Sequence, residues 1–224
     1  MKQLNLYDML AVVAPGAVLV IGLSHLFPAL GVLLASKELS LGDFGLVLLS
    51  SYVAGNLLSP ISHVVQAVWF KCRGGSYTSR IQKKNSGILH QTEIEALNRK
   101  ARKYSMLKED EDIRGISASH WEALTRQIRA FLANRGSVDR IEVFNAHYGL
   151  NRGLAAALLV IIIAVGLCRR VDGLPAIGGL LVGLCLAIYR MNDFGRYYAT
   201  ELMRHFINFT DGNQTETTEK TQGD

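Results

Sequence analysis

Residues 154–167 read LAAALLVIIIAVGL, and this uncharged stretch decides the fold class of the chain. With its neighbours it forms an apolar run over residues 150–168, whose 19 residues would extend for about 28 Å as an α-helix. The hydrocarbon core of a bilayer is about 30 Å thick. Because Leu, Ile and Val each contribute about −0.3 to −0.6 kcal/mol on a membrane-insertion scale, this run is expected to insert as a transmembrane helix.

Three more apolar runs occupy residues 9–34, 44–65 and 173–189. Four such runs in 224 residues leave too little polar surface for a soluble protein to cover them. The first run fits a cleaved signal peptide poorly, because Asp8 precedes it and no small-x-small cleavage motif follows. The sequence therefore predicts an all-α, polytopic membrane protein with four transmembrane helices in two hairpins and a small helical cytosolic insert.

The basic charge between the hairpins sets the predicted orientation. Residues 71–152 carry 16 Lys and Arg against 9 Asp and Glu, a net charge of 16 − 9 = +7. The connection over residues 27–43 has only Lys37 against Glu38 and Asp43. By the positive-inside rule, the insert and both termini are expected on the cytoplasmic side of the cell inner membrane. The bilayer surface accounts for this charge, so no nucleic-acid partner is expected.

The insert is predicted to be helical. Thr92 and Glu95 form a capping-box pattern for one helix, and Ser119 and Glu122 form a second. The apolar residues of the second helix share one face: Trp121, Leu124, Ile128, Phe131 and Leu132. The second and third apolar runs have no breaker at their insert ends, so both helices are expected to extend unbroken out of the membrane. The predicted divisions are a hairpin (1–70), the insert (71–149), a second hairpin (150–190), an amphipathic cytosolic helix (191–209) and a disordered tail (210–224).

Polar residues form a stripe along the second apolar run. They recur at steps of four and three and so share one helical face: Tyr52, Asn56, Ser59, His63 and Gln66. Polar groups in hydrocarbon need partners, so this face should look toward other helices or water. One interpretation is interhelical hydrogen bonding that holds the bundle together. The functional interpretation is an ion pathway or a subunit interface.

Paired glycines indicate helix packing. Gly149 and Gly153 form a GxxxG motif where the third run begins, and Gly179 and Gly183 form another in the fourth run. Packing within one subunit and homo-oligomerisation are both consistent with these motifs.

Catalytic patterns are weak. Arg114 with His120, and Arg140 with His147, resemble the Arg-x4-6-His signature of HEPN ribonucleases, but ten arginines in residues 71–152 make such spacings frequent by chance. A second set of charged residues lies at the end of the fourth run: Arg190, Asp193 and Arg196. These residues could contact a phosphate or lipid headgroup, or they could form a local ion pair at i, i+3. No nucleophile set or metal-ligand spacing is present, so no enzyme activity, cofactor or metal is expected.

Three segments carry a resemblance. They are NLYDMLAVVAPG (5–16), SYVAGNLLSPISHVVQAVW (51–69) and FNAHYGLNRGLAAALL (144–159). They resemble bacterial four-span inner-membrane proteins of uncharacterised function that share a Tyr-Asp…Pro-Gly start, although many of those have His where this chain has Asn56. Such proteins are often found near antiviral-defence or mobile-element genes, which implies a membrane effector. The likeness does not cover the insert and carries over no active-site residue.

The function expected from these features is a signal-responsive, channel-like membrane effector, gated when a cytosolic protein or small ligand binds the helical insert. The alternative is a membrane anchor or scaffold that recruits a cytosolic partner through two aromatic residues and a basic helix of the insert: Trp121, Phe131, Arg99, Lys100, Arg102 and Lys103. A lipid-handling or phosphate-handling enzyme is a third class.

Overall fold

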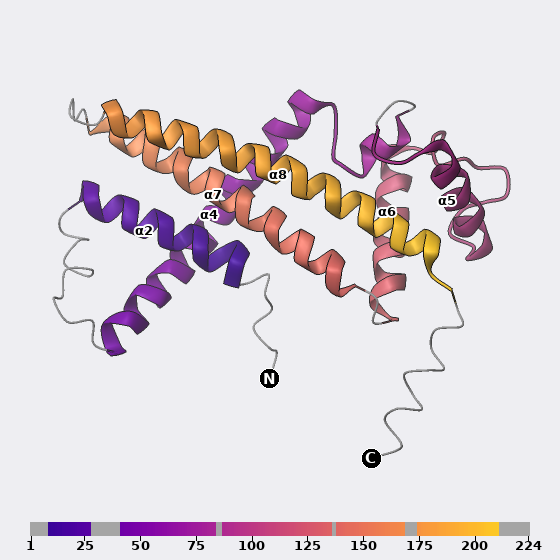
Figure 1. The fold of residues 1–224 in the computed structure, drawn as a ribbon, viewed down its shortest axis with the longest axis horizontal. Helices are drawn as coiled ribbons and strands as arrows, with labels where there is room; N and C mark the ends of the chain where they lie inside the picture. Colours follow the sequence, from indigo (N-terminus) through magenta and orange to yellow (C-terminus); the bar gives the residue numbers. More distant parts are fainter. Residues whose placement is uncertain (1–8, 28–40, 84–86, 136–137, 169–173, 211–224) are drawn as a thin grey trace, which may run out of the picture. The chain divides into compact units, whose positions relative to one another are not determined.

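The computed structural model describes residues 9–27, 41–83, 87–135, 138–168 and 174–210 (Figure 1). The elements are η1 (Met9–Val13, a π-helix), α2 (Ala14–Leu26), α4 (Leu41–Arg73), η2 (Ser79–Gln82, a 3₁₀-helix), α5 (Gln91–Lys103), α6 (Ala118–Ala133), α7 (Asp139–Leu167) and α8 (Leu174–Asn208). No strand occurs in these ranges, so the all-α prediction is confirmed for the part of the chain that the structure describes.

Within the described residues, three helices, α4, α7 and α8, are long and apolar enough to cross a membrane. They have 33, 29 and 35 residues, or about 43 to 53 Å of helix, and so exceed the roughly 30 Å hydrocarbon core. The prediction that two of them extend beyond their apolar runs is confirmed, because α4 continues to Arg73 and α7 begins at Asp139. The first apolar run forms the shorter helix α2, which ends at Leu26, and residues 28–34 of that run lie outside the described ranges.

The chain divides into two compact units. Unit 1 comprises Met1–Tyr77 and Asp139–Tyr198, and unit 2 comprises Thr78–Val138 and Ala199–Asp224. Helix α8 is uninterrupted and has residues in both, so no break separates the fourth apolar run from the predicted amphipathic helix. The predicted tail lies outside the described ranges, Thr210 excepted.

The core of unit 1 is built on α7. Its alanines 155–157 are fully buried, and Ala156 and Ala157 share one core cluster with Leu19 of α2 and Leu58 of α4. Small side chains let helices approach closely, which suits helix packing in a bilayer. Helix α8 lies along α7, where the ring of Phe194 stacks on His147 with centroids 4.9 Å apart (Figure 1).

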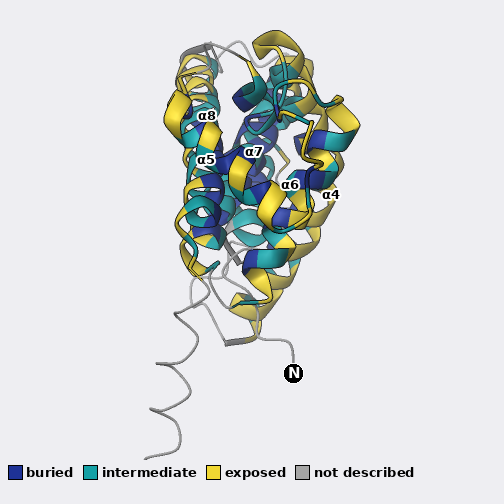
Figure 2. Ribbon diagram, turned by 90° about the vertical axis from the view of Figure 1, so that its right-hand side faces the viewer, coloured by how far each residue is buried: buried dark blue, intermediate teal, exposed yellow. Residues whose placement is uncertain are grey.

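The outer face of α4 is apolar and exposed. Leu57 and Val64 are 69% and 63% exposed, and α4 is largely yellow in Figure 2. Contiguous exposed apolar surface marks contact with a membrane or another protein. Together with the helix lengths, it gives the chain the composition and surface of a membrane protein.

The core of unit 2 combines α5, α6 and the C-terminal part of α8. The predicted apolar face of α6 is confirmed, since Trp121, Leu124, Ile128 and Leu132 are at most 1% exposed. Phe131 is half-buried instead, in a cluster with Tyr104, Phe206 and Phe209 whose ring centroids lie 4.5 to 6.0 Å apart.

Both predicted capping boxes were placed two residues too late. Helix α5 starts after His90, whose backbone N–H donates to Glu93 Oε2 at 2.8 Å, so Thr92 already lies inside the helix. Helix α6 starts after Ser117, whose hydroxyl accepts from the His120 N–H at 3.3 Å. The N-cap of α5 is a histidine, whose extended backbone places its N–H toward Glu93, whereas the sequence pattern requires Ser or Thr there. In α6 the N-cap is a serine, but His120 stands three residues later, where the pattern requires Glu or Gln.

Glu93 makes the first turn of α5 sensitive to acid. Burial opposes the ionised carboxylate, but the His90 N–H and the Arg204 guanidinium, 2.7 Å away, outweigh it and lower the pKa of Glu93 below 4.5. A carboxyl whose pKa is lower in the folded state stabilises the fold above its unfolded pKa and loses that effect as the pH falls through the folded pKa.

We therefore expect hydrogen-exchange protection of the first turn of α5, corrected for the intrinsic exchange rate, to fall as the pH drops below about 4.5. In Glu93→Gln this acid-dependent loss should be smaller, whereas Glu95→Gln, on an exposed neighbour in the same helix, should behave as the wild type. An unchanged pH dependence in Glu93→Gln would contradict the assignment.

Candidate functional site

A polar pocket of about 190 Å³ lies within unit 1, where η1, α2, α4 and α7 meet. Its lining residues are Ala11 and Val12 of η1, Pro15 of α2, Gly55, Asn56, Leu58, Ser59, Ser62 and His63 of α4, and Arg152 and Gly153 of α7. Five of these side chains are polar, although each helix that supplies them is apolar enough to span a membrane. The pocket is therefore a local polar site within apolar helices.

The stripe on α4 contributes three of these polar groups. Asn56, Ser59 and His63 lie in the wall, as their shared helical face allows. Gln66 joins them indirectly through a hydrogen bond to Arg152. Tyr52 is not among the lining residues and is 47% exposed. The structure thus brings most of the predicted stripe together at one site.

Arg152 supplies the charge of the pocket. Its Nη1 donates to Gln66 Oε1 at 2.7 Å, and its guanidinium lies 5.9 Å from the ring centroid of Tyr148. Its Nε is buried and has no hydrogen-bond partner among the described residues. Sequence reasoning counted Arg152 only with the basic insert, although a charged residue three positions into an apolar run was the signal of a functional group.

The helix backbone adds polarity to the α4 wall. Pro60 has no N–H, so the carbonyl of Asn56 lacks its usual partner within the helix. The amide of Asn56 donates to the Tyr52 carbonyl at 2.9 Å, and the Ser62 hydroxyl donates to the Ser59 carbonyl at 2.8 Å. On the opposite wall, η1 is a π-helix, a form that is frequent at functional sites.

Glycines allow the elements that line the pocket to approach one another closely. A Cβ added at Gly55 would lie 2.1 Å from the Val12 carbonyl oxygen, and one at Gly153 would lie 2.6 Å from the Pro15 ring. Gly153, predicted as a packing residue, therefore packs within the chain, and Gly149 is also buried.

The second predicted glycine pair behaves differently. A Cβ at Gly179 would meet nothing within 4 Å, and one at Gly183 would make an ordinary contact with Leu158 of α7. The predicted homo-oligomer contact through this pair stays a prediction.

The residues predicted for partner contact divide between the interior and the surface of unit 2. Trp121 is fully buried, so it offers no surface to a partner. Lys100 donates to the Ile207 carbonyl at 2.8 Å and to the Phe209 carbonyl, and Arg102 donates to the Glu111 carbonyl at 2.8 Å. Phe131 is covered by the guanidinium of Arg135, 3.7 Å from its ring centroid. The exposed basic residues of α5 are Arg99, Arg102 and Lys103.

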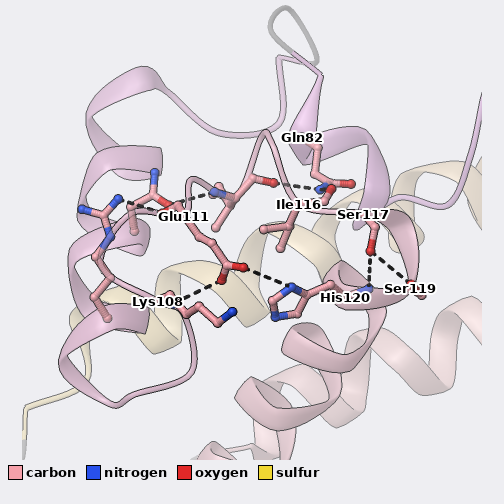
Figure 3. Close-up of polar contacts among 10 residues, drawn as sticks. Gln82, Lys108, Glu111, Ile116, Ser117, Ser119 and His120 are labelled. Atoms are coloured by element: carbon pink, nitrogen blue, oxygen red, sulfur yellow. Dashed lines mark hydrogen bonds and ion pairs between the residues drawn. The ribbon is translucent and has the colours of Figure 1, made fainter.

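Two hollows of unit 2 are both lined by Glu111 and His120. Figure 3 shows the polar contacts around these two residues. The His120 Nδ1 lies 4.0 Å from Glu111 Oε1, and Glu111 Oε2 accepts from the Lys108 N–H at 3.2 Å. Gln82 donates to the carbonyls of Ile113 and Ile116 at 2.7 and 3.2 Å. These contacts hold the loop between α5 and α6, and the Ser117 hydroxyl serves as the cap of α6.

The fourth-run cluster does not form the expected ion pairs. Arg190 lies over the ring of Phe194, 5.0 Å from its centroid, and neither it nor Arg196 is within 4.0 Å of an Asp193 oxygen in the described structure. His147, one of the two histidines in the nuclease-like spacings, is stacked on the same Phe194.

Within the described ranges, no group of three or more His, Cys, Asp or Glu residues is placed to hold a metal ion. Comparison of the chain with protein-family models, with curated proteins and with solved structures gave no match. The likeness to bacterial four-span proteins therefore stays a prediction.

Proposed function

We propose that the protein is a multi-pass membrane effector in which the polar pocket of unit 1 opens into a pathway for a polar or charged solute. The observation that carries this proposal is the convergence of Asn56, Ser59 and His63 with Arg152 inside apolar helices. Polar and ionisable residues in such helices are costly and commonly mark a substrate or ion pathway.

In the proposed arrangement, η1 and α2 together form the first of four spans. Met9–Leu26 is about 27 Å long as a helix, slightly less than the hydrocarbon core. The basic insert and both termini lie in the cytosol, as the charge distribution favours. The exposed apolar face of α4 then contacts lipid, and the protein resides in the inner membrane.

Gating would use the helix that belongs to both units. Binding of a partner or small ligand to unit 2 would favour one position of the C-terminal part of α8, and a continuous helix would carry that preference into unit 1. A ligand moves such an equilibrium only by its difference in affinity for the two states.

The test is the double variant Asn56→Leu, His63→Leu, expressed in bacteria while membrane potential and dye entry are followed. Removing two polar groups takes away two of the hydrogen-bond partners of a solute, and an unpaired polar group costs about 2–7 kcal/mol, so we expect solute entry to fall at least about tenfold. The matched control is Leu57→Ala, Val64→Ala, two exposed residues of α4 with the same spacing that do not line the pocket, and it should retain activity.

We call Asn56→Leu, His63→Leu the stripe variant. Equal permeability in the stripe variant and the wild type would contradict the pathway. An intact potential at high expression would favour the scaffold class, for which the exposed basic residues of α5 are the specific observation. That class predicts a captured cytosolic partner that is lost in Arg99→Glu, Lys103→Glu and kept in the stripe variant.

A further inference from the structure

Arg152 is a cation without a counter-ion. None of the described residues that line the pocket is acidic, and the one hydrogen-bond partner of its guanidinium in the described structure is the neutral amide of Gln66. Its buried Nε donates to no described atom. An arginine in a membrane helix is costly, by up to about 2.5–3.5 kcal/mol at the helix centre on the insertion scale and by less toward the helix end, and an anion or water lowers this cost. The pocket therefore presents a positive charge that an anion would neutralise.

The position of the pocket along the helices points to the headgroup level. Arg152 is the third residue of the apolar run 150–168, and His63 lies two residues before the end of the run 44–65. Both run ends adjoin the basic insert, with Lys71 and Arg73 in the last turn of α4. In a membrane, groups at this depth meet the phosphates of the lipid headgroups, and basic pockets between helices on the cytoplasmic side bind such groups.

The remaining donors suit phosphate oxygens. A guanidinium presents a planar fork that pairs with phosphate, and Gln66 holds one arm of the Arg152 fork in place. Asn56 uses one amide proton on the Tyr52 carbonyl and keeps a second, since its amide carries two. The Ser59 hydroxyl and the His63 ring complete a wall in which donors can surround one anionic group.

We infer that this pocket binds a phosphate group, with Arg152 as its charge partner and Asn56, Ser59 and His63 as additional hydrogen-bonding groups. The inference deepens the proposed function, because it names what the same pocket takes, and it does not require that the protein conducts. The phosphate can belong to an anionic lipid or be free in solution.

The experiment uses the full chain, purified in neutral detergent and stripped of lipid, and follows its unfolding temperature during titration. The probes are dioleoyl-phosphatidylglycerol, inorganic phosphate, and dioleoylglycerol, a lipid of the same acyl chains without phosphate. We expect saturable stabilisation by a phosphate-bearing probe and none by dioleoylglycerol. Stabilisation by inorganic phosphate that competes with the lipid identifies a site for free phosphate, whereas stabilisation by the lipid alone identifies a headgroup site.

Three variants locate the binding. Arg152→Gln should bind the effective probe at least about tenfold more weakly, because it loses the charge and the fork. Arg152→Lys should be intermediate, since it keeps the charge alone. Arg140→Gln, on an exposed arginine of α7 that does not line the pocket, should bind as the wild type does.

The inference is overturned if neither phosphate probe stabilises the protein, if dioleoylglycerol is equally effective, or if Arg152→Gln binds as tightly as the wild type. If Arg152→Gln does not fold, the stabilisation of the wild type by the phosphate probes, compared with dioleoylglycerol, tests the inference. Phosphate binding together with unchanged permeability in the stripe variant would defeat the proposed pathway and leave the binding site standing. Absence of phosphate binding together with reduced permeability in the stripe variant would contradict the binding site and leave the proposed pathway standing.

Discussion

Gly55→Ala is expected to prevent unit 1 from assembling. At this point η1 and α2 cross α4 with backbone against backbone, because a Cβ at Gly16 would also lie 1.8 Å from the Ser51 carbonyl oxygen. A Cβ at Gly55 would meet the Val12 carbonyl at 2.1 Å, and no rotamer change can move a backbone atom. Overpacking of a core usually costs 1–3 kcal/mol, and we expect about 3 kcal/mol or more here. Size-exclusion chromatography of detergent-purified protein after heating measures the loss.

Gly45→Ala is the matched control, since Gly45 is in the same helix and a Cβ there would meet nothing within 4 Å. Alanine favours a helix over glycine by about 1 kcal/mol, so this variant should be neutral or more heat-resistant. The two substitutions are chemically identical and have opposite expected signs. Equal heat resistance of both variants would show that the close crossing of α2 and α4 is wrong.

Trp121→Ala is expected to unfold unit 2. The indole is fully buried at the centre of the predicted apolar face of α6, and truncation of a core Trp costs about 3–5 kcal/mol. Its Nε1 has no hydrogen-bond partner in the described structure, which offsets part of that value and places the expected loss at the lower end. Limited proteolysis of the full chain should then cut between residues 78 and 138.

Arg126→Ala, on the exposed side of α6, is the control and should leave the proteolysis pattern unchanged. If Trp121→Ala and the wild type were equally resistant to proteolysis, the indole would lie outside the core. Loss of a captured partner in this variant would not by itself support the scaffold class, because an unfolded unit 2 explains it. Charge reversal at Arg99 and Lys103, which are exposed, avoids that ambiguity.

Helix type and extent could be predicted because long apolar runs and the absence of breakers act locally. The extension of α4 and α7 beyond their apolar runs needed no knowledge of packing. Trp121 could have been placed as well, because its helical phase with Leu124 and Ile128 marks it as a core residue and not as a contact for a partner.

The site could be predicted in part. Periodicity gave the α4 face, but which segments meet that face depends on close approach at Gly55 and Gly153, which no single-helix pattern contains. Arg152 was missed because its sequence neighbourhood is basic, whereas its spatial neighbours are the polar residues of another helix. The cap of α5 was missed because the residue that begins it, His90, is not a usual cap.

The uninterrupted course of α8 restricts which insertions and deletions the chain can accept. Each residue of an α-helix turns the next by about 100°, so one residue inserted between Leu180 and Phe194 would rotate Phe194 by that angle relative to Ile177 and Leu180. All three side chains pack within unit 1, Ile177 and Leu180 on the core around Ala156 and Phe194 on His147, so the insertion would break one of these contacts. Substitutions at exposed positions of this stretch, such as Val182 and Leu186, can be tolerated singly, but an insertion or deletion of one residue cannot. In related chains, the length of this stretch should therefore be held more tightly than its composition.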